Sequence, residues 1–219
     1  MLKQFKYTDN SDIFLTSDTH FGHCNIIRYC NRPFNSVEEM DEKLISNWNS
    51  VVSKDSTVFH LGDFAFCGSD KMSKILSRLN GHIVLIKGNH DHLQNTILSK
   101  FEDVLPQLHI EIGKKHIYLN HYPFLTYAGA YRSNYVIQLF GHEHLGEAYL
   151  NKDVSRLKML LPTQYDVGVD LNNYRPISWA EVKNKLDYQL EHNVNCLHWI
   201  GNGQLLKESW IKKLIKSFI

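Results

Sequence analysis

Five short apolar runs of this chain are each followed closely by residues of types that bind metals. Asp18 and His20 follow the run 13–15, and Asp63 follows the run 58–61. The other three runs are 83–86, followed by Asn89, His90 and Asp91, 117–119, followed by His121, and 136–140, followed by His142 and His144. Imidazoles and carboxylates are common transition-metal ligands in proteins. Their recurrence at five places predicts a metal centre assembled from several segments of the chain.

The apolar runs must position these residues, and they have the character of buried strands. They are short and rich in Val and Ile, and they alternate with stretches of helical periodicity, which indicates an α/β fold. In α/β sheets the ligand site lies outside the carboxyl ends of the strands. We therefore expect all five groups of polar side chains to meet at one sheet edge.

A chain of 219 residues is long enough for one domain with a full hydrophobic core. We expect a single domain over 1–219 with a helical insertion at about 21–56 and an amphipathic helix at about 204–219. In that last stretch lysines lie between apolar residues repeated every fourth position. Packing on the domain is the first interpretation of this helix, and docking to a membrane surface or a partner is the alternative.

Capping residues and periodicity predict the other elements. Ser36 and Glu39 have the spacing of a capping box, which begins a helix with one apolar face. Further helices are expected at 70–79, after Asp91, and from Ser178, with Glu181 as its capping partner, to about 190. Two strands are expected within 104–120, around a turn at 113–114, and a last central strand at 165–171.

The composition excludes several classes of protein. A net charge of +1 gives no overall field that favours nucleic acid or membrane, so a polyanionic substrate would need a local basic patch. No apolar run has the length of a membrane span or the form of a signal peptide. The four cysteines form no CxxC pair, and free thiols predict a reducing compartment, hence the cytoplasm.

The polar groups also occur in the order of a known family. D-x-H at 18–20, G-D at 62–63, G-N-H-D at 88–91, His121 and G-H-x-H at 141–144 together resemble the calcineurin-like metallophosphoesterases. The segments 17–27 with 32–34, and 167–170 with 173–176, are similar to the opening and closing segments of a group of small bacterial and phage phosphoesterases. The resemblance covers residues 13 to about 180 and implies two packed mixed β-sheets flanked by helices, with a dimetal site at one edge.

The resemblance also implies a ligand set for two metal ions. Asp18, His20 and His144 would hold one ion, Asn89, His121 and His142 would hold the other, and Asp63 would bridge the two. A carboxylate has two oxygens and so can bridge two cations. Neutral imidazoles bind cations without cancelling the positive charge of the cations. A mixed nitrogen and oxygen set favours manganese, with Fe, Zn, Co or Ni as alternatives. Phe66 stands where purple acid phosphatases have a tyrosinate ligand, so Fe(III)–tyrosinate chemistry is not expected.

The residues beside the ligands have expected catalytic roles. By the same resemblance His90 touches the phosphate and protonates the leaving oxygen, while Asp91 orients its imidazole. Three further residues, His23, Arg28 and Arg32, are candidates for substrate binding from the insertion. His23 could instead cap a helix, and the arginines could instead form ion pairs within the protein. Tyr122 and Arg132 are weaker candidates for a base or sugar pocket.

The expected activity is a metal-dependent phosphodiesterase that attacks with a dimetal-bound hydroxide and acts on a nucleotide-like or other small ester. Three alternatives remain open from the sequence: a phosphomonoesterase with the same mechanism, an accessory nuclease that binds a partner through the basic C-terminal helix, and a scaffold that kept the fold and lost the chemistry. Near-neutral charge favours small substrates over long polyanions. The intact motifs, His90 included, argue against the scaffold.

Overall fold

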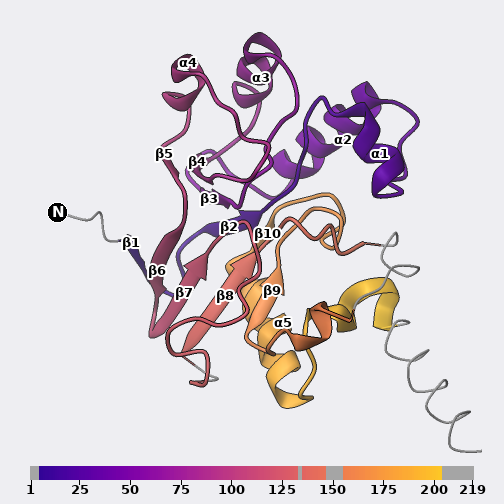
Figure 1. Ribbon diagram of the computed structural model, residues 1–219. Helices are drawn as coiled ribbons and strands as arrows, with labels where there is room; N and C mark the ends of the chain where they lie inside the picture. The colour runs from indigo at the N-terminus through magenta and orange to yellow at the C-terminus, as the bar shows by residue number, and fades with distance from the viewer. Residues whose placement is uncertain (1–4, 133–134, 147–154, 204–219) are drawn as a thin grey trace, which may run out of the picture.

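Two five-stranded sheets with flanking helices form the protein in a computed structural model that describes residues 5–132, 135–146 and 155–203 (Figure 1). The first sheet runs, in order, through β1 (Phe5–Tyr7), β6 (Leu108–Ile112), β7 (Lys115–Leu119), β8 (Val136–Phe140) and β9 (Gln164–Asp166). The second runs through β10 (Ile177–Ser178), β2 (Ile13–Thr16), β3 (Thr57–His60), β4 (His82–Ile86) and β5 (Asp103–Leu105). The expected α/β fold with two mixed sheets is confirmed.

Both sheets are mostly parallel where the polar groups follow the strands. In the second sheet β2, β3, β4 and β5 are parallel, and β10 is antiparallel at the edge. In the first sheet β7, β8 and β9 are parallel, whereas β6 and β7 form the antiparallel hairpin expected around residues 113–114. Parallel strands end on the same side, so the loops after β2, β3 and β4 emerge together, as do those after β7 and β8.

Side chains alternate between two hydrophobic cores along the central strands. Ile13 and Leu15 of β2 face the core between the sheets, where they join Ile117 and Leu119 of β7. Phe14, between them, faces the second core. Strands with apolar residues on both faces are typical of sheets covered on both sides.

Helices cover the outer side of the second sheet. The structure has helices α1 (Cys24–Tyr29), α2 (Val37–Asn49), α3 (Ser69–Leu76), α4 (Asn95–Leu98) and α5 (Trp179–Glu191), with 3-10 helices η2 (Leu157–Met159) and η3 (Cys196–Gly203). Met40, Leu44 and Trp48 of α2 are buried in the second core, as the periodicity predicted. Figure 1 shows α1, α2 and α3 on one side of the molecule, and α5 contacts β2, β9 and β10.

The helix starts confirm one capping box and correct another. At α5 the Ser178 side chain accepts from the Glu181 N–H while the Glu181 carboxylate accepts from the Ser178 N–H, so the box is complete. At α2 Ser36 accepts from the Glu39 N–H, but the Glu39 carboxylate accepts from the N–H of Asn35 instead. The predicted box at α2 is therefore only half formed.

The predicted last central strand at 165–171 is wrong in length and in place. Strand β9 ends at Asp166 and lies at an edge of its sheet. The Asp166 carboxylate accepts from the N–H of Gly168 at 2.7 Å, which bends the chain away from an extended path. Residues 204–219, with the predicted amphipathic helix, lie outside the described residues. In the part of the chain that is described, no helix has the length and apolar character needed to span a membrane.

Candidate metal centre

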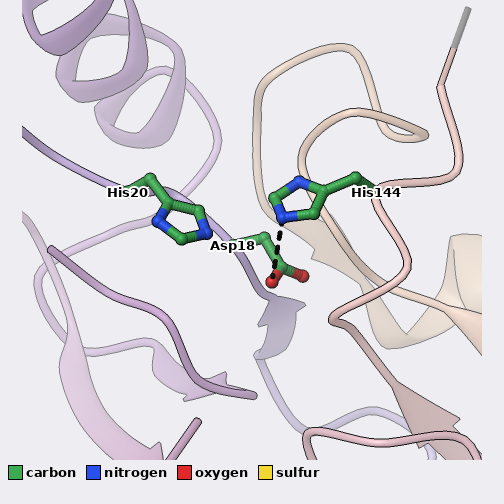
Figure 2. A group of neighbouring side chains, drawn as sticks. All are labelled: Asp18, His20 and His144. Carbon is green, nitrogen blue, oxygen red and sulfur yellow. Dashed lines mark ion pairs between the residues drawn. The ribbon is translucent and has the colours of Figure 1, made fainter. Parts of the chain in front are cut away.

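The loops after five strands bring the predicted ligands together in two groups. Asp18, His20 and His144 form the first group, in which one ligand atom of each residue lies within 4.8 Å of the others. Figure 2 shows His20 and His144 approaching Asp18 from opposite sides. The His144 Nε2 is 3.8 Å from the Asp18 Oδ1, and both Asp18 and His20 are buried.

The second group surrounds His121, which is buried at the end of β7. Asp63, His121 and His142 offer ligand atoms within 4.8 Å of one another. The Nε2 of His121 lies 3.0 Å from the Asn89 Oδ1 and 3.2 Å from the His142 Nδ1. Asn89 thus lies where the sequence analysis expected it, beside His121 and His142.

Asp63 connects the two groups. Its Oδ2 lies 3.5 Å from the Nε2 of His20 and 3.5 Å from the Nε2 of His121. One carboxylate oxygen is therefore equally close to a histidine of each group, which is the position that a bridging ligand requires.

The hydrogen bonds of His121 leave a lone pair directed into the second group. Its Nδ1 lies 2.7 Å from the Leu61 carbonyl oxygen, which only accepts, so Nδ1 carries the hydrogen. In the neutral ring Nε2 is then an acceptor that faces the acceptor oxygens of Asn89 and Asp63. Burial alone would lower the pKa of His121, but its hydrogen bond with Asp63 and the charges of Asp18 and Asp63 raise it, so a proton can occupy the Nε2 position. A cation in place of this proton would face the same nitrogen and oxygen atoms, so this donor set fits a metal ion.

Two buried atoms of the first group support the same assignment. The Oδ1 of Asp18 and the Nε2 of His20 are buried without a hydrogen-bond partner. Unsatisfied buried polar atoms are rare in folded proteins, and a bound ion is one of their ordinary explanations. The chemistry of both groups therefore fits two divalent cations.

The backbone is strained at the same residues. Five predicted ligands have φ between 49° and 70°, the left-handed region that residues other than glycine rarely adopt. They are Asp18, His20, Asp63, His142 and His144. Such conformations cost about 1–3 kcal/mol each and concentrate at functional sites. Here five predicted ligands share the strain, so the fold tolerates this cost where the loops turn toward the site.

Glycines allow the loops to approach closely. A Cβ added at Gly88 would overlap the Asp63 carboxylate and lie 2.9 Å from the His121 Cε1. A Cβ at Gly62, whose φ is +98°, would lie 2.6 Å from the His121 Nδ1. Any larger residue at either position would push the loop away from the ligands.

The protonation states are set by burial and by neighbouring charges. Burial, with repulsion from His144, lowers the pKa of His20 well below its ordinary value and so keeps its lone pair available. Burial alone would also lower the pKa of His144, but the carboxylates of Asp18 and Asp170 hold it well above its ordinary value. The same carboxylate field attracts any cation that can replace this proton.

Comparison with known proteins identifies the family. The model of the family described as "Calcineurin-like phosphoesterase" matches residues 12–213. The chain belongs to this family. Phosphoesterases of this family bind two metal ions, and the two ligand groups described above are the candidate site in this member.

Three proteins are similar to half of this chain or more. An uncharacterized protein of Methanocaldococcus jannaschii is 37% identical over 170 residues, which cover 76% of this chain and 86% of that protein. The Gene 66 protein of Mycobacterium phage L5 is 32% identical over 135 residues, 52% of this chain and 65% of that protein. A solved structure of a protein of unknown function from Aquifex aeolicus has a TM-score of 0.63 and 26% identity, and it covers 80% of this chain and 99% of its own.

His90 lies at the surface of the candidate site, whereas Asp91 is buried. The His90 ring lies edge-on to His20, with centroids 5.6 Å apart, and the backbone N–H of His90 donates to the Asp63 Oδ1 at 2.9 Å. The expectation that Asp91 orients the His90 imidazole is wrong. Both Asp91 oxygens instead accept backbone N–H bonds at 2.8–2.9 Å, from Asp63, Phe64 and Gly88. Asp91 therefore ties the loop after β3 to the loop after β4.

Arg32 is also placed differently from the expectation of a substrate clamp. Its guanidinium is buried and binds both oxygens of Asp170 at 2.8 Å. It also donates to the backbone carbonyls of Asp18 and Thr19 at 2.7 and 3.1 Å. All of these partners belong to the protein, so Arg32 holds the loop that carries Asp18 and is not available to a substrate.

Asp170 is a site residue that the sequence analysis gave no role. Its Oδ2 lies 2.8 Å from the His144 Nδ1, and because an ionised carboxylate only accepts, His144 donates this bond. The Nε2 of His144 is thereby left free to face Asp18. The sequence signal was present in the segment 167–170, which the family resemblance singled out. The three side chains of Arg32, Asp170 and His144 thus form one hydrogen-bonded chain.

The remaining candidates lie at different distances from the site. The His23 Nδ1 lies 3.4 Å from the His20 Nδ1, so His23 stays a candidate for substrate contact. Arg28 is exposed on α1 with its guanidinium over the ring of Tyr29. The Tyr122 hydroxyl lies 3.3 Å from the Asn89 Oδ1, at the rim of the site, and Arg132 lies beside Tyr131.

Replacing Asp170 with asparagine is expected to weaken manganese binding about 10–100-fold, the usual effect of removing a carboxylate that orients a ligating histidine. The measurement is calorimetric titration of the metal-free protein with Mn²⁺. The change also leaves the Arg32 charge buried and unpaired, which costs about 3–5 kcal/mol of stability. The control is Arg32→Leu alone, which disturbs the same loop but leaves the Asp170 carboxylate beside His144. It should lose stability and keep more of its metal affinity than Asp170→Asn, and an equal loss of affinity in the two variants would refute the orienting role.

Proposed function

We propose that this protein is a metal-dependent phosphodiesterase that hydrolyses a small, nucleotide-like ester. One observation carries the proposal: the Asp63 Oδ2 lies 3.5 Å from a ring nitrogen of each ligand group, beside the exposed His90. Asp18, His20 and His144 would hold one divalent ion, and Asn89, His121 and His142 the other, with Asp63 shared. Manganese is the metal that we propose, with Fe, Zn, Co or Ni as alternatives for this nitrogen and oxygen set.

When bound, two such cations would polarise the phosphoryl group and lower the pKa of a water molecule. The protein's own residues would do the rest. Asp63 and Asp18 neutralise charge from buried positions, and the neutral Asn89 amide limits negative charge next to an anionic ester. His90 lies at the open side of the site, where it would donate a proton to the oxygen that leaves as water attacks phosphorus from the opposite side.

A diester is preferred to a monoester because exposed aromatic rings lie on two sides of the ligands. Phe66 is 52% exposed and lies 5.7 Å from His90, ring centroid to ring centroid. Tyr122 is 44% exposed and lies 4.7 Å from His142. A diester has an organic group for each ring, whereas a monoester has one. The four free cysteines support a reducing compartment, and we propose the cytoplasm.

The test compares bis-p-nitrophenyl phosphate with p-nitrophenyl phosphate after chelation and reloading with Mn²⁺. The chelated protein should be inactive, and Mn²⁺ should restore turnover with a higher kcat/KM for the diester. A higher kcat/KM for the monoester would replace the diesterase with a phosphomonoesterase of the same site. A folded protein that binds two Mn²⁺ ions and hydrolyses neither ester, nor a panel of cyclic and linear nucleotides, would overturn the proposal in favour of a scaffold.

A further inference from the structure

A pocket of about 300 Å³ opens beside His90. The residues that line it are Ala65, Phe66, Cys67, Met72, His90 and His92. Because His90 both lines this pocket and lies against the ligand His20, the pocket begins where the proposed reaction takes place. A group bound there would be attached to phosphorus through the oxygen nearest His90.

Phe66 forms the most prominent wall of the pocket. Its ring stacks on the His23 ring with centroids 4.6 Å apart and planes inclined by 29°. The His90 ring meets it nearly at right angles, at 5.7 Å and 80°. About half of the Phe66 side chain nevertheless remains exposed to solvent. Fully burying a side chain of this kind would stabilise the fold by about 1.5–3 kcal/mol. The two histidines thus hold the ring in a fixed orientation without covering it.

The lining suits a flat aromatic ring and not a charged group. Neither a carboxylate nor an ammonium group is among the lining residues, and Lys71 on α3 is paired with Asp41 at 2.8 Å. Met72 and Cys67 supply polarisable sulfur, which makes favourable contacts with aromatic rings. The His90 and His92 imidazoles add polar atoms that can hydrogen-bond to the edge of a ring that carries nitrogen or oxygen.

The size of the pocket agrees with this chemistry. A cavity of about 150 Å³ holds benzene, so about 300 Å³ has room for a one- or two-ring group at an open site. Aromatic pairs gain about 0.5–1.5 kcal/mol beyond the burial of area, which an alkyl group cannot match.

We infer that the pocket lined by Phe66, Met72 and His90 binds a planar aromatic ring of the group that leaves from phosphorus, such as a nucleobase or a phenol. The inference rests on the proposed function, because it assigns the ring to the leaving side of that reaction. His23 then has a definite part: it supports the stacking ring from behind.

The test uses phenylphosphonate and methylphosphonate, which carry the same anionic group and differ in the ring. Each is titrated calorimetrically into the Mn²⁺-loaded protein, for wild type, Phe66→Ala and Tyr131→Ala. Wild type should bind phenylphosphonate about tenfold more tightly, the size expected of one aromatic contact. Phe66→Ala should bring the ratio of the two affinities close to one. Tyr131→Ala removes another exposed aromatic ring, which does not line the pocket, and should keep the wild-type ratio.

A wild-type ratio near one, or an equal loss of affinity for both phosphonates in Phe66→Ala, would overturn the pocket assignment. In that case turnover of the nitrophenyl esters by the wild type would still support the phosphodiesterase. Absence of turnover together with a preference for phenylphosphonate that Phe66→Ala removes would leave the aromatic pocket in place and remove only the proposed reaction. The two failures are therefore distinguishable.

Discussion

Asp63→Asn is expected to abolish metal-dependent turnover while the fold survives. The shared Oδ2 would become an amide nitrogen, which cannot ligate the two ions between which this oxygen is proposed to lie. The loss should exceed the roughly 100-fold upper range for removing an outer ligand partner. Hydrolysis of bis-p-nitrophenyl phosphate and the number of Mn²⁺ ions bound per chain are the two measurements.

The metal-free variant should fold but be less stable at neutral pH than the metal-free wild type. Burial alone would raise the pKa of Asp63, but its hydrogen bond from His121 and that residue's charge hold it below its ordinary value, so the ionised carboxylate stabilises the fold at neutral pH. Asparagine keeps an oxygen for the His90 N–H and offers an amide N–H to the His20 Nε2, which lacks a partner. A variant that still binds two ions and retains turnover would refute the bridging position.

The fold and the proximity of the seven predicted ligands could be predicted from the sequence because both depend on the order of nearby residues. The seven ligands follow five strand-like runs closely, and parallel strands end at the same edge of a sheet. Helix α2 was likewise visible in its periodicity, since Met40, Leu44 and Trp48 share one face. These features need only nearby residues and one rule of topology.

The polar contacts that support the site could not be predicted from the sequence because they join residues far apart in the chain. Arg32 and Asp170 are 138 positions apart, and nothing in their spacing shows that the guanidinium meets a carboxylate of the protein instead of a phosphate. Asp91 was misassigned because its neighbour in sequence, His90, points elsewhere, while its three N–H partners come partly from the loop after β3. Charged pairs across loops depend on the completed fold, which one sequence does not reveal.

The strained backbone offers a further reason why the ligands share one edge. Five predicted ligands adopt left-handed φ values, and the glycines beside them leave no room for a Cβ. The loops are thus bent tightly enough to bring side chains from two sheets within 4.8 Å of one another. Arg32, Asp91 and Asp170 then fix these bends with hydrogen bonds to the loops and to His144.

His90→Ala is expected to reduce turnover by about 10²–10⁴-fold, the range of general acid catalysis, with the larger loss for poor leaving groups. The His90 imidazole contacts His20 edge-on, and the backbone N–H of His90, which alanine retains, donates to Asp63. The number of Mn²⁺ ions bound should therefore not change. Diphenyl phosphate, whose leaving phenol resembles a tyrosine side chain with a pKa of about 10, should lose more kcat than bis-p-nitrophenyl phosphate, whose leaving group needs less help from a proton.

The matched control is His82→Ala, which removes an exposed histidine at the opposite end of β4 and should leave kcat for both esters unchanged. The dependence on the leaving group separates a proton donor from a residue that only binds the phosphate. A pure binding role would raise KM and lower the rate for both esters by the same factor. Equal losses of kcat for the two esters would therefore remove the general acid from the mechanism, even if the overall loss were large.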